Sequence, residues 1–599
     1  MEKLKDRSAI NDKYKWDLWA LIKDEQELEN KINEVLRLLE KVISYKGKIM
    51  ESSDNLYCFY QEYEKFSRLL GQIAVYTHLN YDQDTTNNDA KKLQLKIDKL
   101  YENINEQTAF INSEILSVSF DKVEKFINSD DRLKPYYFDL KQMFKYKEHT
   151  LSEKEEAVIA KASNALGYCS DVFDAIDNTD VDLGMVSIDG KETQLTQSNY
   201  SIIIRSDLRN VRKDAFLKMH DYYKKHIHTI SANYLGNIKE EFFFSKVRNF
   251  KNPLERSLYD DDISVDVYTN LIQTIHNNLD KVYRYYELKR QFLNVNELHM
   301  YDVYAGLNEK EADKISFDEG KEISFNALKP LGDEYLNDLK KAFIEKWVDI
   351  YPNKGKKSGA YSSGCYDSYP YVLLNYENNV NSVSTLVHEL GHSMHSYYTN
   401  ANQPYLYSGY SIFLAEIAST VNEMLLNDYL YKNAQTDEEK IKYLIEFLEV
   451  FRATIYRQTM FAEFEMQVFD KYEKGISLTK DELCETYYEL NKLYFGSDVI
   501  IDDSIKYEWA RIPHFYTPFY VYKYATGLSA ALSIVTDILE GKENARENYL
   551  TFLKSGSSDY PLEILKRAGV DMTKSEPIER ACNMFEQKVN ELEKILNSK

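Results

Sequence analysis

Long stretches without helix breakers constrain the fold of this chain more than any other feature. Glycine and proline account for 20 and 10 of its 599 residues, so turns are few and secondary-structure elements are long. In "ELENKINEVLRLLEKVISY" the apolar residues recur at steps of four and three, which lines one face of a helix. They are Leu28, Ile32, Val35, Leu39 and Val42. The sequence therefore predicts a mainly α-helical fold, with two or more layers or domains because the chain exceeds one hydrophobic core.

Two short stretches break this helical pattern. In "MVSIDGKETQL", Asp189-Gly190 separates two alternating segments, which predicts a β-hairpin with a tight turn. The stretch "SGAYSSGCYDSYPYVLLNYENN" ends in an apolar run from Tyr371 to Leu374, which predicts one or two strands. We place a domain boundary at the hairpin, with a helical amino-terminal region over residues 1–190 and a larger region over residues 191–599.

Charge and cysteine usage exclude several classes of protein. A formal net charge of -22 argues against binding to nucleic acid or to anionic membrane surfaces. No window approaches the 18 or more apolar residues that would span a bilayer, and the start of the chain lacks the apolar run of a signal peptide, so we expect a cytoplasmic protein. The five cysteines are odd in number, far apart and without a C-x-x-C pair, which predicts reduced thiols.

The stretch "STLVHELGHSMHSYY" carries the pattern H-E-x-x-H at His388, Glu389 and His392. Residues four apart lie one turn above each other on a helix, so His388 and His392 can direct two imidazole nitrogens at one ion. Zinc lowers the pKa of a bound water towards ~7, and a carboxylate can then take the proton and deliver it to a leaving amine. The spacing therefore predicts half of a zinc site with Glu389 as general base.

The third ligand distinguishes the classes that use this pattern. One class places a histidine six residues after the second histidine, with a glycine between, but this chain has Tyr398 and His395 at those positions. The other class uses a glutamate from a following helix, and Glu416 lies 24 residues after His392 among apolar neighbours. Glu423 would hold a ligand histidine by its other nitrogen, and His395 is expected to pack.

At this point the chain resembles a known family. "HELGHSMH" followed by "FLAEIAST", together with "KKSGAYSSGCYDSYPYVLLNY" and "RIPHFYTPFYVYKYATGLSAA", is similar to the M3 family of zinc metallopeptidases, and most similar to its oligoendopeptidase F branch. The resemblance implies a multi-helical, zincin-type fold with a small β-sheet beside the active-site helix. It also implies a deep substrate cleft, to which residues 1–190 contribute, beside an M3-like catalytic region over residues 191–599.

The resemblance also implies roles for two further segments. The family places a histidine and tyrosines of the carboxyl-terminal segment over the scissile bond. By this resemblance the histidine is His514 and the tyrosine is Tyr522, with Tyr516 as a further candidate. Donors aimed at the oxyanion of the tetrahedral intermediate lower the barrier by about 3 kcal/mol each. Residues 358–375 resemble the family's edge strand, on which a peptide can lie as an added strand, and Gly359 and Gly364 would allow its close approach.

These observations predict an enzyme that binds one zinc ion through His388, His392 and Glu416 and hydrolyses internal bonds of short, unstructured oligopeptides. The attacking water would be bound by the zinc and deprotonated by Glu389. A zinc carboxypeptidase or dipeptidyl carboxypeptidase is an alternative, because no residue that grips a substrate carboxylate can be identified. A catalytically silent peptide-binding protein is a second alternative, which the presence of Glu389 disfavours. The oligomeric state is left open.

Overall fold

A computed structural model describes residues 4–163, 166–306 and 314–598, and the chain divides into two compact units. Unit 1 comprises Met1–Glu148, Ala312–Tyr429 and Ile534–Gly569. Unit 2 comprises His149–Glu311, Leu430–Ser533 and Val570–Lys599. Each unit is therefore assembled from three separate stretches of chain. The boundary predicted at residue 190 separates two regions that would form a substrate cleft. The two compact units do not test that division, so it stays a prediction.

Unit 1 is mainly helical. Its helices are α1 (Glu25–Ile43), α2 (Ser53–Asp82), α3 (Asn88–Thr108), α4 (Phe110–Leu116), α5 (Phe120–Ser129), α6 (Tyr137–Lys145), α14 (Phe317–Ala327), α15 (Gly332–Leu339), α16 (Lys341–Ile344), α17 (Val380–Asn402), α18 (Ile412–Asn433), α23 (Ala545–Leu553) and α24 (Pro561–Arg567). The helix α18 continues into the first four residues of the next stretch of unit 2.

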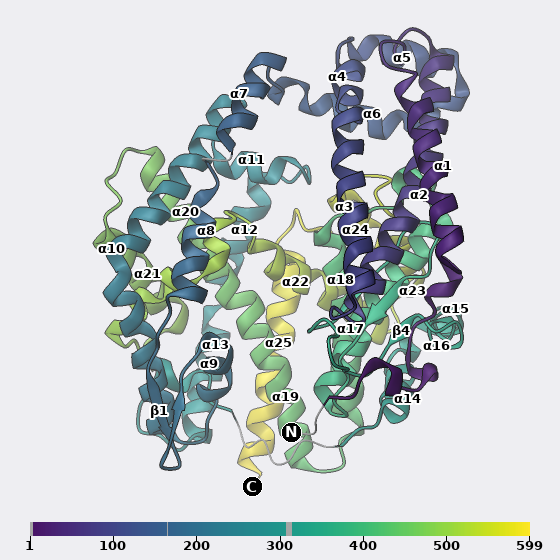
Figure 1. Ribbon diagram of the computed structural model, residues 1–599. Helices are drawn as coiled ribbons and strands as arrows, with labels where there is room; N and C mark the ends of the chain where they lie inside the picture. Colours follow the sequence, from purple (N-terminus) through teal and green to yellow (C-terminus); the bar gives the residue numbers. More distant parts are fainter. Residues whose placement is uncertain (1–3, 164–165, 307–313, 599) are drawn as a thin grey trace. The chain divides into compact units, whose positions relative to one another are not determined.

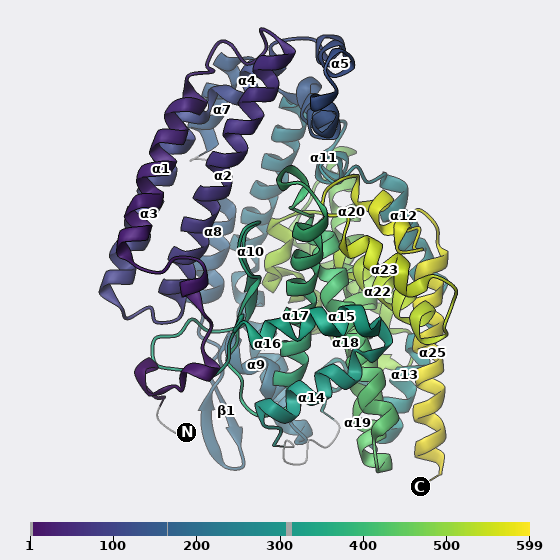
Figure 2. The same cartoon turned by 90° about the vertical axis from the view of Figure 1, so that its right-hand side faces the viewer.

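The long helices α1, α2 and α3 lie side by side (Figures 1 and 2). The apolar stripe predicted from the sequence is the buried face of α1, from Leu28 to Val42. The side chain of Asp24 caps this helix by accepting a hydrogen bond from the N–H of Glu27, which satisfies one of the free donors at the helix start. The predicted long amphipathic helix is confirmed.

A small three-stranded sheet accompanies α17 in unit 1. Its order is β4 (Val348–Asp349), β6 (Tyr371–Leu373) and β5 (Tyr361–Ser363), with β4 parallel and β5 antiparallel to β6. The strand predicted over the apolar run is β6, all of it buried in the centre of the sheet. The strand β5 lies at the edge, and both β5 and β6 contact α17. This arrangement confirms the predicted small sheet beside the H-E-x-x-H helix.

Unit 2 is also mainly helical. Its elements are α7 (Glu153–Ser163), α8 (Tyr168–Asp174), β1 (Met185–Ile188), β2 (Lys191–Gln194), α9 (Gln197–Ile203), α10 (Arg209–Val247), α11 (Pro253–Tyr259), α12 (Val265–His276), α13 (Leu279–Phe292), β3 (Leu298–His299), α19 (Asp437–Phe451), α20 (Arg457–Glu473), α21 (Lys480–Phe495), β7 (Val499–Ile500), α22 (Tyr522–Leu539) and α25 (Glu576–Asn597). The helix α22 ends in unit 1. The strands β3 and β7 form a short parallel pair.

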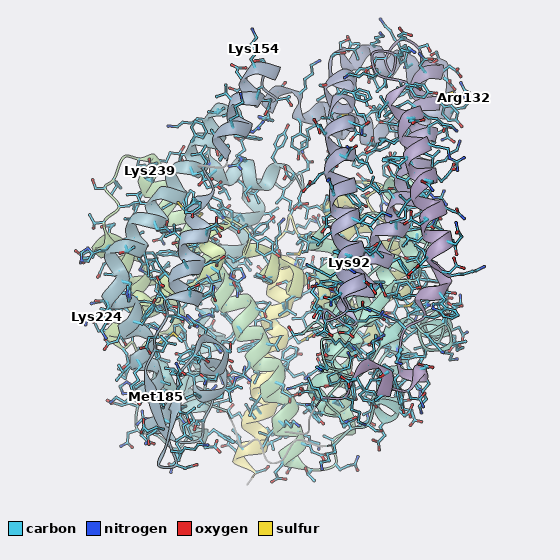
Figure 3. The ribbon with its side chains drawn as sticks, viewed as in Figure 1. Lys92, Arg132, Lys154, Met185, Lys224 and Lys239 are labelled. Atoms are coloured by element: carbon cyan, nitrogen blue, oxygen red, sulfur yellow. The ribbon has the colours of Figure 1, made fainter. Side chains whose placement is uncertain are left out.

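The longest helix of unit 2, α10, has one buried and one exposed face. Tyr223, Tyr234 and Ile238 are buried, whereas Lys224 and Lys239 project outward (Figure 3). Elsewhere in this unit α25 packs against α12, α13 and α19. Amphipathic helices packed in this way give each unit its own core.

The hairpin predicted at Asp189-Gly190 is formed by β1 and β2. These strands are antiparallel, and Ile188 pairs with Lys191 across the turn. Asp189 and Gly190 have φ angles of 50° and 78°, the left-handed conformation that two-residue hairpin turns require. The sequence prediction is confirmed at this position.

Two further expectations can be compared with the structure. All five cysteines are free thiols, as their number and spacing predict. Across the described residues, no helix is long and apolar enough to cross a membrane. The deep substrate cleft stays a prediction.

Candidate active site

The helix α17 brings the two histidines of the H-E-x-x-H pattern together. The side chain of Asn379 caps the helix by accepting a hydrogen bond from the N–H of Ser382. Apolar residues such as Leu386 and Leu390 are fully buried, and they fix the rotation of the helix. On an adjacent face, Nε2 of His388 and Nε2 of His392 lie 3.1 Å apart. The i, i+4 spacing therefore produces the convergence that the sequence predicted.

The helix α18 adds a carboxylate to this pair. One ligand atom from each of His388, His392 and Glu416 falls within 4.8 Å of the others, and Glu416 Oε2 is 4.0 Å from His388 Nε2. Glu416 was expected to be held against apolar neighbours, but its side chain is 45% exposed. The partly exposed carboxylate thus completes the cluster at a position that solvent reaches, as a catalytic metal site requires.

Both histidines also have oxygen partners outside this pair. Glu423 Oε1 lies 3.3 Å from Nδ1 of His388, and the backbone of Ala415 accepts a hydrogen bond from His392. Burial, and then the nearby His388 ring, lowers the pKa of His392 to about 4, so this ring is neutral near pH 7. The role predicted for Glu423, to hold a histidine by its other nitrogen, matches this position.

The two facing nitrogens fit a metal ion. Against the effect of burial, Glu423 raises the pKa of His388, so its Nε2–H can donate to Nε2 of His392 across 3.1 Å. A divalent ion would replace that proton, because both nitrogens can then direct lone pairs at the same cation. Two imidazole nitrogens and one carboxylate are the ligand set of a catalytic metal site with an open position. The donor set thus fits a divalent metal ion.

Glu389 points to the same region but is more enclosed. Its exposed fraction is 7%, and its carboxylate accepts a hydrogen bond from the N–H of Ser362 on β5. Burial raises the pKa of Glu389 to about 7, against the opposing effect of the His388 ring, and the carboxylates of the two glutamates on α18 act in the same direction as burial. A carboxyl that titrates near neutrality is suited to exchange protons at that pH.

The edge strand β5 is held from both sides. On one side, the hydroxyls of Ser362 and Ser393 of α17 lie 2.8 Å apart. On the other, the hydroxyl of Tyr361 donates to Asp82 of α2 over 2.8 Å. Ser363 Oγ likewise lies 3.0 Å from a ring nitrogen of His78, also on α2. Sequence reasoning missed these supports, because α2 is far from the strand along the chain and local spacing does not show which side chain of α17 reaches it.

Of the two glycines expected to admit a peptide, only one has open space. A Cβ on Gly364 would lie 2.8 Å from the carbonyl oxygen of Tyr369, so this glycine permits the chain to fold against itself. A Cβ on Gly359 would meet nothing within 4 Å, but its φ of 81° favours glycine for the backbone conformation.

Sequence reasoning also missed a glycine that brings the two metal-site helices together. A Cβ on Gly391 would lie 2.6 Å from the Cα of Ser419 and 2.9 Å from the carbonyl oxygen of Ala418. The side chain of Asn422 on α18 donates to the carbonyl oxygen of Val387 on α17. The glycine inside H-E-x-x-H was the available signal, since glycine in a helix interior costs stability unless a close approach requires it.

His395 has the packing role expected from its position. Its ring is fully buried and stacks on Tyr410 at a centroid distance of 3.8 Å, with Phe552 beside it at 5.2 Å. Burial lowers the pKa of His395 to about 3, so the ring stays neutral.

The carboxyl-terminal candidates lie in unit 2, in and after a short 3-10 turn over Pro513–Tyr516. His514 is partly exposed, its Nε2 is 3.3 Å from the hydroxyl of Tyr524, and burial lowers its pKa. The ring of Tyr520 stacks beside it at a centroid distance of 6.4 Å. His514, Tyr520 and Tyr524 therefore form one partly exposed aromatic group.

The two tyrosines selected from the sequence lie elsewhere in this segment. Tyr522 is 1% exposed and packs on Tyr268 at a centroid distance of 5.3 Å. Tyr516 accepts a hydrogen bond from Asn233 and packs on Phe173. Burial of the Tyr522 hydroxyl argues against contact with a substrate, and the assignment of Tyr516 and Tyr522 as oxyanion donors stays a prediction.

The chain is similar to known peptidases in both sequence and structure. Residues 202–584 match Peptidase family M3, and residues 114–182 match Oligopeptidase F. Oligopeptidase PepF of Bacillus subtilis (strain 168) is 42% identical over 99% of this chain and 89% of its own length. A crystal structure from Chlamydophila abortus covers 99% of this chain and 100% of its own, with a TM-score of 0.93 and 36% identity. Oligoendopeptidase-F from Enterococcus faecium covers 96% and 100%, with a TM-score of 0.72 and 33% identity.

A helical fold with these paired histidines and a glutamate on the following helix defines a metallopeptidase, an enzyme that hydrolyses peptide bonds. This chain belongs to peptidase family M3, and within it to the oligoendopeptidase F branch. The resemblance drawn from the sequence is confirmed.

Proposed function

We propose that this chain is a zinc-dependent endopeptidase that hydrolyses internal bonds of short, unstructured oligopeptides. The observation that carries the proposal is the convergence of His388 and His392, with Nε2 atoms 3.1 Å apart, beside the carboxylate of Glu416. These three residues would hold one zinc ion. Two imidazoles and one carboxylate suit zinc because it accepts both nitrogen and oxygen ligands in a tetrahedral arrangement with one open position.

Glu389 is the proposed general base. When bound, zinc supplies a Lewis acid that polarises the scissile carbonyl and lowers the pKa of water at its open position. Glu389 takes the proton of the attacking water and later gives it to the leaving amine. The N–H of Ser362 holds the carboxylate in place for both steps. Enclosure of Glu389, with an exposed fraction of 7%, supports this role because a poorly solvated carboxylate accepts a proton more readily.

The edge strand β5 is the proposed support for the substrate backbone. A peptide can add to a sheet edge as a further strand, and main-chain hydrogen bonds then supply the binding without demanding a particular side chain. The contacts of β5 with α2 and α17 use its side chains and the N–H of Ser362. Other backbone groups of this edge strand would then be able to pair with a peptide. The names of the relatives, oligopeptidase and oligoendopeptidase, agree with oligopeptides as substrates.

His514 is the proposed hydrogen-bond donor to the oxyanion. Among the tyrosines of its segment we favour Tyr524 as the second donor, because its hydroxyl lies 3.3 Å from His514 Nε2 and its side chain is partly exposed. The ring of Tyr520 contacts both His514 and Tyr524, and Tyr520 is the next candidate for this donor. The sequence-based candidates Tyr516 and Tyr522 remain alternatives that kinetics can test.

Product analysis tests the proposal. The full-length protein is incubated with a mixed set of peptides, with a chelator and then with added zinc, and the products are identified by mass spectrometry. We expect cleavage at internal bonds, loss of activity with the chelator and recovery with zinc. Release of only one or two residues from the carboxyl end would instead indicate a carboxypeptidase or dipeptidyl carboxypeptidase. Bound but uncleaved peptides would indicate the silent peptide-binding protein.

A ligand variant tests the metal assignment separately. Glu416→Ala should severely weaken zinc binding, because only two neutral nitrogens would remain. Zinc content after dialysis against a weak chelator provides the measurement. Zinc that stays bound in this variant would show that another residue supplies the third ligand.

The predicted cytoplasmic location can be checked by fractionation of the cells that produce the protein.

A further inference from the structure

Phe519 has an unusual backbone conformation for an aromatic residue. Its φ is 61°, whereas the other non-glycine residues with positive φ in the described parts of the chain are Asp, Asn or Lys. Asn and Asp tolerate this left-handed conformation, but a bulky residue adopts it only when its surroundings hold it there. Such strain concentrates at functional segments, and Phe519 lies between His514 and Tyr524.

Glu465 on α20 holds this conformation directly. Its Oε1 accepts a hydrogen bond from the N–H of Phe519 over 3.1 Å, and Glu465 is fully buried. The ring of Phe519 packs on Phe469, one turn further along the same helix, at a centroid distance of 4.8 Å. The ring of Tyr268 on α12 also packs on Phe519, at a centroid distance of 5.9 Å. Both the backbone and the ring of Phe519 are therefore fixed by α20.

The positions on either side of Phe519 are fixed as well. The hydroxyl of Ser257 donates to the carbonyl oxygen of Pro518 over 3.3 Å. Beyond the turn, the ammonium group of Lys523 lies 2.7 Å from the carboxylate of Asp261. The carbonyl group of Pro518 and the side chain of Lys523 are thus each held by a contact, and Glu465 supplies the contact at the strained residue between them.

We infer that Glu465 is a positioning residue for peptide hydrolysis: by holding Phe519 in the left-handed conformation, it sets the direction of the segment that carries His514, Tyr520 and Tyr524. Glu465 acts through the backbone of Phe519 and not through contact with the substrate. The inference rests on the proposed function of His514 and Tyr524 as donors. A displacement of about 1 Å in such groups can lower turnover by up to ~100-fold.

A conservative substitution can test the positioning role of Glu465, because glutamine keeps its hydrogen-bond acceptor. Burial raises the pKa of the Glu465 carboxyl well above the usual range and so favours the protonated form, against the effect of the Phe519 N–H. Glutamine is uncharged like that form, has nearly the same shape and retains a carbonyl oxygen as acceptor. Leucine has a comparable volume but no acceptor, and it leaves the N–H of Phe519 unpaired.

The experiment compares kcat and KM of Glu465→Gln and Glu465→Leu on one oligopeptide, using the full-length enzyme loaded with zinc. We expect Glu465→Leu to lower kcat by roughly 10- to 100-fold with little change in KM, because the donors are displaced while the zinc site is intact. Glu465→Gln should stay within about threefold of the native kcat, since the acceptor is retained. Equal losses in the two variants, or a native kcat in Glu465→Leu, would overturn the inference.

Glu463→Leu is the matched control. Glu463 is buried on the same helix, but it pairs with His276 and Tyr494 rather than with the His514 segment. This variant should lower the melting temperature as Glu465→Leu does and leave kcat near native at a low temperature. If Glu465→Leu does not fold, Glu465→Asp replaces it, because it keeps the carboxyl and draws the acceptor back by one methylene. The same loss of kcat is then expected.

A double variant separates the inference from the function on which it rests. If Glu465 acts through the donors, Glu465→Leu should lower kcat much less in a His514→Ala background than in the native enzyme. If the double variant instead lost kcat by the product of the two single losses, the positioning role would be rejected. A native kcat in His514→Ala alone would reject the donor role of His514, which is a different failure. Zinc content is measured throughout and should not change.

Discussion

The two groups of proposed catalytic residues differ in the backbone that carries them. His388, Glu389 and His392 lie on a regular helix, where a spacing of four residues places two rings one turn apart. Their Nε2 atoms meet at 3.1 Å, as the spacing predicts. In a helix, residue number therefore determines direction, and a short pattern of letters is enough to predict the geometry.

The segment from His514 to Tyr524 has no such period. It passes through a 3-10 turn and then through Phe519 in a left-handed conformation before α22 begins at Tyr522. Tyr524 lies beside His514, whereas Tyr522 is buried against Tyr268. One histidine and four tyrosines within eleven positions therefore point in different directions, and their spacing alone does not identify the exposed ones.

The largest effect is expected on the regular side of this comparison. Glu389→Gln should lower kcat by about 10²- to 10⁴-fold, because the amide can still bind water but cannot take its proton. Zinc content should match that of the native enzyme, because the ligands are untouched. Parallel measurements of turnover and bound zinc check this prediction. His395→Phe, on the same helix, keeps the stack on Tyr410 and should retain near-native turnover. Near-native turnover in Glu389→Gln would remove Glu389 from the role of base.

A smaller effect is expected in the irregular segment, where the question is which tyrosine matters. Tyr524→Phe and His514→Ala should each lower kcat by roughly 10²-fold, the cost of losing one oxyanion donor, with little change in KM. Tyr522→Phe should leave turnover near native, because the hydroxyl it removes is buried. Steady-state kinetics on one peptide decide between them. A large loss of kcat in Tyr522→Phe with native Tyr524→Phe would restore the assignment made from the sequence.

The support of His388 by Glu423 should have a more modest effect. Glu423→Ala should weaken zinc binding by about 10- to 100-fold, since the acceptor for Nδ1 of His388 is lost while all three proposed ligands remain. Competition with a chromophoric chelator gives the affinity. Glu423→Gln retains an oxygen acceptor and should lose less. Equal affinities in the native protein and Glu423→Ala would show that the histidine is oriented by other contacts.

The smallest expected effect concerns the packing of the two helices at the regular site. Gly391→Ala should destabilise the protein by about 1–3 kcal/mol, because the new methyl group would overlap the backbone of Ser419. Gly409→Ala is the control, since a Cβ there meets nothing within 4 Å. Thermal unfolding of both variants measures the difference. Identical melting temperatures would mean that α17 and α18 can separate without cost.

Much of the fold could be predicted because it depends on local periodicity. The stripe from Leu28 to Val42 predicted a buried helical face, and the pair Asp189-Gly190 predicted a hairpin turn. What could not be predicted depends on contacts between segments that are distant along the chain. The assembly of each unit from three stretches is of this kind.

The same distinction holds within the site. The two histidines could be predicted from helical spacing, and Glu416 from its distance along the chain, although its expected apolar enclosure is not found. The donation from the N–H of Ser362 to Glu389 could not, because it joins a strand to a helix that begins later in the chain. Nor could the contact between Glu465 and Phe519, which are 54 residues apart.

The shortness of β5 has a consequence for the pace of the proposed reaction. The strand has three residues, so a peptide laid along it can exchange only a few main-chain hydrogen bonds. Each is worth about 0.5–1.5 kcal/mol net, so this pairing alone supplies about the affinity of a millimolar complex. Cleavage divides even these bonds between two fragments. Both products should therefore have brief residence times, and accumulated fragments should inhibit the enzyme only weakly.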